Sequence, residues 1–204
     1  MKLSTRERRV ATLTVGNASP TVELAGRYRH VRRHSTDLVA RLSDADATAQ
    51  SMPDASPAKW HLGHTTWFFE TFVLRDCVPG YRLFDARFPV LFNSYYETEG
   101  ARIARAARGV LTRPSLAEIC AYRHHVDEAI AAAFDAFGPT AMHLIELGCQ
   151  HEQQHQELLL TDILHLFAQN PLAPSRWDAR DRLPGQAPSP MSWTTGREGP
   201  IGVG

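Results

Sequence analysis

The segment with the clearest chemical potential is the pair of histidines in His151-Glu-Gln-Gln-His155. Residues four apart on an α-helix project from nearly the same face, so the two imidazoles could bind one metal ion together. The same face carries leucines and a glycine, which predicts that both histidines point into a helical core. Two converging imidazoles in a core need partners, and a metal ion would satisfy both of them.

Two other interpretations of this segment compete with a metal site of this kind. The five residues also fit the H-E-x-x-H pattern of zinc proteases, in which the glutamate acts as general base. However, residues 140–170 offer no third ligand at the spacings of those proteases, and no sheet edge is available to hold a peptide. The plainer alternative is a pair of histidines that are solvated at the surface or hydrogen-bonded in the core.

A third ligand is expected upstream, in Trp60-His61-Leu62-Gly63-His64. His64 is in register with a stripe of aromatic residues, and His61 lies close to that stripe, so periodicity alone leaves both open. Three neutral imidazoles facing an open position suit zinc and iron(II) equally well by donor type. The other six histidines fall on faces rich in Arg or Gln and are predicted at the surface: His30, His34, His124, His125, His143 and His165.

The elements that position these histidines are predicted to be helices, since residues 1–170 show no sustained period-two alternation. Ser56 is expected to cap a helix that has Pro57 at its first position and ends before Val78. Ser115, with Glu118 three residues on, forms a capping-box pattern. The expected helices cover residues 21–43, 57–77, about 91 to beyond 105, 115–137 and 140–169. Such a series with short connections favours an all-α, antiparallel four-helix bundle.

Composition divides the chain into three parts. Residues 1–20 are expected to be a loose arm, and residues 21–170 form the bundle. Residues 171–204 hold six of the 13 prolines and five of the 13 glycines, so they are too poor in core-forming segments to fold alone. This irregular Pro/Gly-rich tail is interpreted as a linker, followed by strand beginnings at residues 192–193 and 201–203.

Charge and cysteine content restrict the partners and the compartment. Lys and Arg together number 22, as do Asp and Glu, so the chain lacks the basic excess of a nucleic-acid-binding protein. No apolar run approaches the ~20 residues of a membrane span. Three cysteines in 204 residues make no disulfide framework, which favours a reducing compartment. We therefore expect a cytoplasmic protein that binds neither nucleic acid nor membrane.

Several separate motifs, taken together in their order and spacing, carry a family resemblance. They are Ser51–Pro57, Lys59–Phe72, Phe92–Glu97, Arg108-Gly109, Arg113-Pro114, Tyr122-Arg123, Val126-Asp127 and His151–Asp162. Over about residues 21–175 the chain resembles the N-terminal DinB-like domain of the ergothioneine-biosynthesis sulfoxide synthases, the hercynine-oxygenase family.

That resemblance implies a DinB-like bundle with a three-histidine site for non-haem Fe(II), whose ligands fall by motif match on His64, His151 and His155. It implies that a thiol, either cysteine or γ-glutamylcysteine, is joined to the imidazole C2 of hercynine with O₂ to give a sulfoxide. It also implies a second domain similar to formylglycine-generating enzymes, which supplies a catalytic tyrosine and much of the pocket. The tail would then be the truncated start of that domain, and this chain alone would be inactive.

Two further functions stay open from the sequence. The chain is similar in length to stand-alone DinB-like proteins, which resemble metal-dependent thiol S-transferases that often use zinc or nickel. It could also be an inactive fragment that binds metal weakly. Three arginines are candidates for holding substrate carboxylates from their location alone, with a solvated surface charge as the alternative for each: Arg75, Arg82 and Arg87.

Overall fold

The computed structural model describes residues 19–94, 96–175, 189–196 and 199–200, and the chain divides after Pro174 into two units. The described residues of the first unit form helices joined by loops. Its long helices are α1 (Pro20–Val39), α3 (Ala58–Phe68), α5 (Leu116–Ala133) and α6 (Pro139–Ala168). The short ones are α2 (Asp44–Thr48), α4 (Phe88–Phe92) and the 3-10 turns η2 (Glu97–Glu99), η3 (Arg105–Val110) and η4 (Phe134–Ala136).

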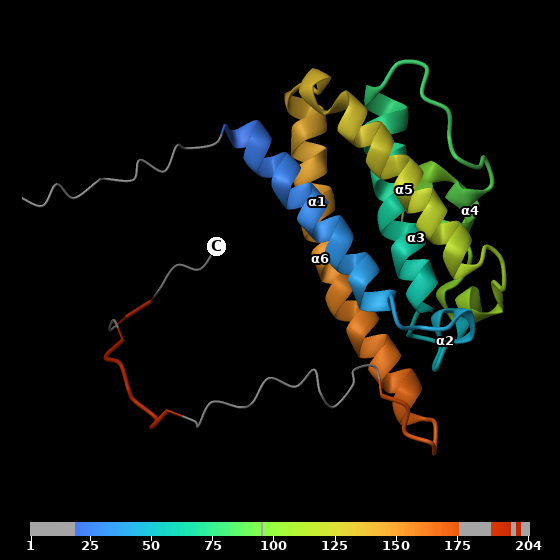
Figure 1. The fold of residues 1–204 in the computed structure, drawn as a ribbon, viewed down its shortest axis with the longest axis vertical. Coiled ribbons are helices and arrows are strands. Elements are labelled where there is room, and N and C mark those ends of the chain that lie inside the picture. The colour runs from blue at the N-terminus through green and yellow to red at the C-terminus, as the bar shows by residue number, and fades with distance from the viewer. Residues whose placement is uncertain (1–18, 95, 176–188, 197–198, 201–204) are drawn as a thin grey trace, which may run out of the picture. The chain divides into compact units, whose positions relative to one another are not determined.

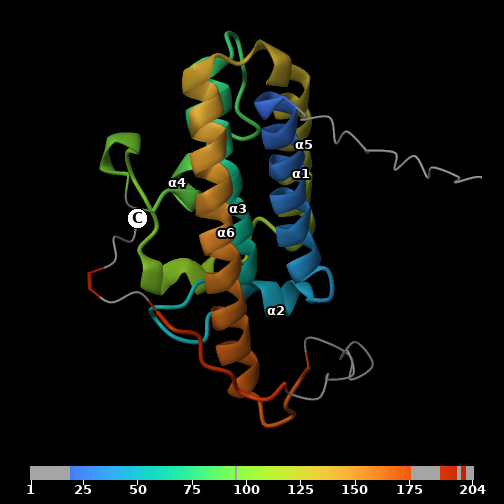
Figure 2. The same cartoon turned by 90° about the vertical axis from the view of Figure 1, so that its left-hand side faces the viewer.

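The four long helices lie side by side, as Figures 1 and 2 show from two directions. Helix α6 packs against both α1 and α3, and α3 also packs against α5. Every residue of α3 is buried, so this helix forms the centre of the bundle. The described residues contain no strand, which confirms the predicted all-α fold class. No described helix is long and apolar enough to cross a membrane.

Several helix boundaries follow from the capping chemistry seen in the sequence. Ser115 caps α5, and Glu118 completes the capping box by accepting from the Ser115 backbone N–H. Helix α6 begins with Pro139 at its first position, where the missing N–H costs nothing. It ends at Ala168, close to the predicted stop.

Three local predictions are wrong. Ser56 does not cap α3: its N–H donates to Asp162 (2.8 Å) instead, so it serves a tertiary contact. The helix expected from about residue 91 to beyond 105 is absent: the 3-10 turns η2 and η3 occupy part of this stretch, and the short α4 ends at Phe92. Helix α4 stops because the Asn93 side chain donates to the Tyr96 carbonyl (3.0 Å) and holds a turn there. Residues 192–193 form no strand, and the strand expected at residues 201–203 lies outside the described residues.

Helix α3 continues without a break into a π-helical segment, η1 (Phe69–Arg75). Its first residue meets α6 at a glycine: a Cβ on Gly148 would lie 2.4 Å from the Phe69 ring. The absence of a side chain at Gly148 therefore lets α6 approach α3 closely, one turn before His151. This contact sets the spacing between the two helices that carry the histidines.

A buried network of charges ties the four long helices together at their centre. The Glu152 carboxylate on α6 is 1% exposed and accepts from Arg32 of α1 (2.9 Å) and Arg123 of α5 (2.7 Å). Both arginines also donate to the Thr66 hydroxyl of α3, at 3.2 and 3.1 Å. Arg32 reaches Asp127 as well (2.6 Å). The two guanidinium groups lower the pKa of Glu152 to about 2 despite its burial.

We predict that Glu152→Gln lowers the free energy of unfolding by about 3–5 kcal/mol, because it removes the buried carboxylate that pairs with Arg123 and leaves Arg32 with Asp127 alone. Urea denaturation followed by circular dichroism measures the effect. The matched control is Glu146→Gln, which breaks the exposed pair with Arg27 and should cost less than about 1 kcal/mol. Equal losses in the two variants would contradict the role given to Glu152.

Candidate metal centre

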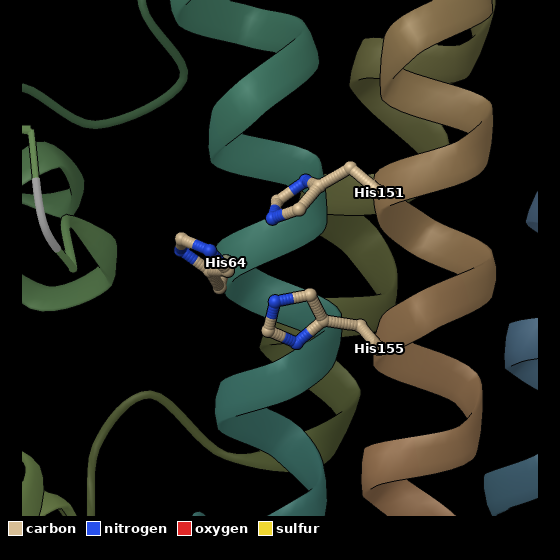
Figure 3. A group of neighbouring side chains, drawn as sticks. All are labelled: His64, His151 and His155. Atoms are coloured by element: carbon tan, nitrogen blue, oxygen red, sulfur yellow. The ribbon is translucent and has the colours of Figure 1, made fainter. Parts of the chain in front are cut away.

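Three histidines from two helices converge in the bundle. His64 projects from α3, and His151 and His155 project from successive turns of α6 (Figure 3). One ring nitrogen from each lies within 4.8 Å of the other two. The ring centroids form a nearly equilateral triangle, with sides of 5.0, 4.7 and 4.7 Å. The structure thus brings together the three histidines that the resemblance implies as ligands.

The orientation of His64 is fixed on all sides. Its Nδ1 lies 2.6 Å from the carbonyl oxygen of Phe92, which can only accept, so Nδ1 carries the proton and Nε2 keeps its lone pair. The ring is stacked between Trp60 and Trp67, at centroid distances of 4.7 and 5.6 Å. Gly63 makes room for this arrangement, because a Cβ there would lie 2.4 Å from the Phe92 ring.

His155 is held by a neighbour that the sequence left open as a ligand. The Nδ1 atoms of His155 and His61 are 2.9 Å apart, and His61 Nε2 lies 3.0 Å from the Asp162 carboxylate. His61 therefore sits behind His155, between that ring and Asp162. It does not belong to the group of three whose nitrogens converge.

His151 has no comparable support within the described part of the chain. Its ring packs against Phe68 at 5.1 Å, and its Nδ1 is buried without a hydrogen-bond partner there. Such an orphaned nitrogen is unusual in a protein interior. In the described structure, Nδ1 of His64 and Nδ1 of His155 each have a hydrogen-bond partner, whereas no hydrogen bond at Nδ1 fixes the tautomer of His151.

The donor set fits a divalent transition metal. Burial lowers the pKa of all three histidines, to about 3 for His64, and charge repulsion from neighbouring histidines lowers the pKa of His64 and His155 further. The imidazoles are therefore neutral at pH 7, which is the form that binds a metal. Three neutral nitrogens of this kind could hold zinc or iron(II), and the geometry does not distinguish between them.

A cavity of about 330 Å³ opens directly onto the three histidines. Its wall carries side chains that differ in chemistry, including Trp60, Tyr96, Arg105, Arg108, Gln154 and Leu158. The guanidinium of Arg108 lies 3.3 Å from the centre of the Trp60 ring and donates to the hydroxyls of Ser56 (2.9 Å) and Ser94 (3.2 Å). The Arg108 guanidinium is thus held in place on one side of the cavity, where it could bind an anionic group, while Asp54 and Asp162 also line the cavity.

The arginines proposed from location alone lie elsewhere. Arg75 pairs with Glu99 at 2.7 Å, Arg87 pairs with Asp85, and Arg82 is exposed. None of the three lines the cavity, so the interpretation as surface charges is the right one for them. Spacing gives no signal for the arginines that do line it. Both lie in the 3-10 turn η3, where the sequence predicted the end of a helix running from about residue 91 to beyond 105.

Two further expectations change with the structure. Glu152 points away from the cavity into its arginine cluster, so it cannot act as the base of an H-E-x-x-H protease site. His165 is half-buried and lies 2.8 Å from the Ser51 hydroxyl, whereas it was predicted at the surface. Gln154, in turn, was missed, although it lies one turn from His151 on the same helical face.

A second, larger cavity of about 550 Å³ lies between α1 and α5, lined among others by Tyr28, Arg33 and Phe134. It contains none of the three histidines. The candidate metal site is therefore in the smaller cavity, which the three histidines line.

Buried neutral histidines make stability depend on pH. The unfolded chain takes up a proton at His64 below about pH 6.5, while the folded chain resists it down to about pH 3. Since the unfolded state binds more protons in that window, stability of the metal-free protein should fall by about 1.4 kcal/mol per pH unit for this group alone as the pH drops below 6.5.

Urea denaturation at pH 7, 6 and 5 with a chelator tests this expectation. His64→Phe should make the pH dependence less steep, and His143→Gln, at an exposed position, should leave it unchanged. A wild-type stability that stays constant from pH 7 to 5 would show that the histidines are not buried in neutral form.

Comparison with known proteins places the fold. A search of curated proteins finds no match. The family model described as the DinB superfamily matches residues 27–159, which span α1 to α6 and include all three converging histidines. The match covers more than half of the chain, so this protein belongs to the DinB superfamily.

Proposed function

We propose that this chain is the iron(II)-binding helical part of an oxygen-dependent sulfoxide synthase, which joins cysteine or γ-glutamylcysteine to hercynine. The observation that carries the proposal is the triangle of His64, His151 and His155 at the floor of a cavity that two arginines also line. The motif series around these residues favours this reaction over others on the same fold. Iron(II), when bound, supplies the redox-active centre for O₂.

The reaction needs an open metal site, and three protein ligands on one side leave room for substrates on the other. Joining the thiol sulfur to the imidazole carbon removes two electrons, and forming the sulfoxide removes two more. O₂ accepts all four, since one oxygen atom enters the product and the other leaves as water. The chain's own part is to hold the ion and to orient the two organic substrates.

The arginines that line the cavity give the substrates a means of orientation. Hercynine and both thiols carry carboxylates, and Arg105 and Arg108 face the same cavity as the histidines. Arg108 is buried against Trp60, so its position is set before a ligand arrives. A bidentate pair between a guanidinium and a carboxylate fixes direction as well as distance. This arrangement would hold a reacting group close to the metal.

The cavity is open on one side, where Leu158 is 43% exposed beside it. A reaction with O₂ needs a wall that excludes bulk water, and it needs an acid close to the oxygen. We propose that a further domain, similar to formylglycine-generating enzymes, covers this opening and completes the pocket.

The metal part of the proposal is tested by anaerobic Fe(II) titration of the 204-residue chain. We expect one ion per chain, and loss of stoichiometric binding when His64, His151 or His155 is replaced by alanine. His165→Ala, which alters a histidine of α6 outside the cavity, should bind as the wild type does. Undiminished binding in all three variants would overturn the assignment of the site.

The reaction part is tested by an assay with Fe(II), hercynine, O₂ and either thiol. We expect the chain alone to bind iron but to turn over poorly, since misplacement by ~1 Å can cost ~100-fold. Addition of a covering domain should restore product. Rapid sulfoxide formation by the chain alone would contradict the need for a cover. Metal-dependent transfer of a thiol to an electrophile, with zinc preferred and no hercynine product, would favour the S-transferase instead.

A further inference from the structure

We propose that His61 and Asp162 form a positioning pair, which holds His155 as the Nδ1-protonated tautomer and thereby presents its Nε2 lone pair to the metal site. This inference deepens the proposed function and rests on it only for the identity of the metal. It assigns a role to two cavity residues that are not among the three converging ligands. Their contribution is to orient a ligand, and they are not expected to contact the ion.

The direction of each hydrogen bond follows from its far end. An ionised Asp162 carboxylate can only accept, so His61 Nε2, 3.0 Å away, must donate. A neutral imidazole has one donor and one acceptor, so His61 Nδ1 is then the acceptor. The other Nδ1, that of His155, lies 2.9 Å away and must donate. Its Nε2 is left unprotonated, on the side of the ring toward His64 and His151 (Figure 3).

Further contacts hold both His61 and Asp162 in place. His61 is 3% exposed and edge-on to Trp60, so its ring has little freedom to turn. The same Asp162 oxygen that accepts from His61 also accepts from the Ser56 backbone N–H at 2.8 Å. The carboxylate is thus fixed by the chain just before α3, although it projects from α6. The pair joins the same two helices that carry the ligands.

The physical effect on a bound cation has two parts. First, an imidazole already in the right tautomer loses no free energy in shifting its proton when the metal arrives. Second, hydrogen bonding of Nδ1–H raises the basicity of the ligand nitrogen, and a carboxylate at the end of the series offsets the positive charge. Removing partners of this kind costs typically ~10–100-fold in metal affinity.

His64 provides an internal comparison. Its Nδ1 is held by a single neutral acceptor, the Phe92 carbonyl, at 2.6 Å. His155 reaches a carboxylate through a second imidazole. Of the three converging histidines, His155 is therefore the one whose support includes a negative charge in the described structure, and the one most sensitive to changes at Asp162.

The test has two readouts on the 204-residue chain. The first is the histidine ¹⁵N spectrum of the metal-free protein, which reports the tautomer of each ring. The second is the affinity for Co(II), followed by its visible absorption. In the wild type we expect His155 protonated at Nδ1. In His61→Phe, which keeps the shape and removes both hydrogen bonds, we expect a mixture of tautomers.

We expect His61→Phe and Asp162→Asn to weaken Co(II) binding by ~10–100-fold while still binding one ion per chain. His61→Gln should recover part of the loss, because its amide also offers one acceptor and one donor. The matched control is His165→Phe, which removes a hydrogen-bonded histidine from α6 outside the cavity and should bind as the wild type does. Circular dichroism verifies that each variant is folded.

Three results would overturn the inference: wild-type affinity and tautomer in His61→Phe, His155 protonated at Nε2 in the wild type, or complete loss of stoichiometric binding in folded His61→Phe. The last would make His61 a ligand itself. The tautomer is read without any metal, so it decides the matter even if Co(II) does not bind. Neither readout involves hercynine, so failure of the proposed reaction would leave both intact and can be told apart.

Discussion

The burial of one carboxylate constrains the whole bundle. Glu152 cannot stay ionised in the core without Arg32 and Arg123, and these come from α1 and α5 while Glu152 lies on α6. Because His151 precedes Glu152 directly and His155 follows three residues later, this bond also fixes the rotation of α6. A turn of α6 by one residue would bring the carboxylate toward the cavity and carry the histidines out of it. The interaction that holds the helices together therefore also aims two of the three ring nitrogens.

Close approach between helices does the rest of the positioning. The missing side chain at Gly148 lets Phe69 come against α6, and the missing side chain at Gly63 lets α4 come against α3. The second contact brings the Phe92 carbonyl to the His64 ring, which fixes the tautomer of that ring. Two glycines thus have a chemical effect, although neither touches the cavity. The site is a property of the packing as much as of the three histidines.

The fold class and two of the three converging histidines could be predicted because they depend on local repeats. The four-residue spacing of His151 and His155 shows on the helix itself, and the capping box of Ser115 and Glu118 marks where α5 begins. Periodicity could not choose between His61 and His64, because both lie near the aromatic stripe; only the resemblance favoured His64. In the structure they differ in their contacts with residues distant in sequence: His64 contacts the Phe92 carbonyl, and His61 contacts Asp162.

The burial of the core arginines is the feature that could least be predicted from the sequence. A charged residue within a helix is ordinarily assigned to solvent, yet Arg32 is 3% exposed, since its partners lie on other helices.

The stack of Trp60, His64 and Trp67 has a consequence of its own. Indole emission responds to whatever lies within a few ångströms of the ring, and a paramagnetic ion quenches it where zinc does not. The protein therefore carries, on either side of one histidine, two natural fluorophores that would report both the arrival of an ion and its kind.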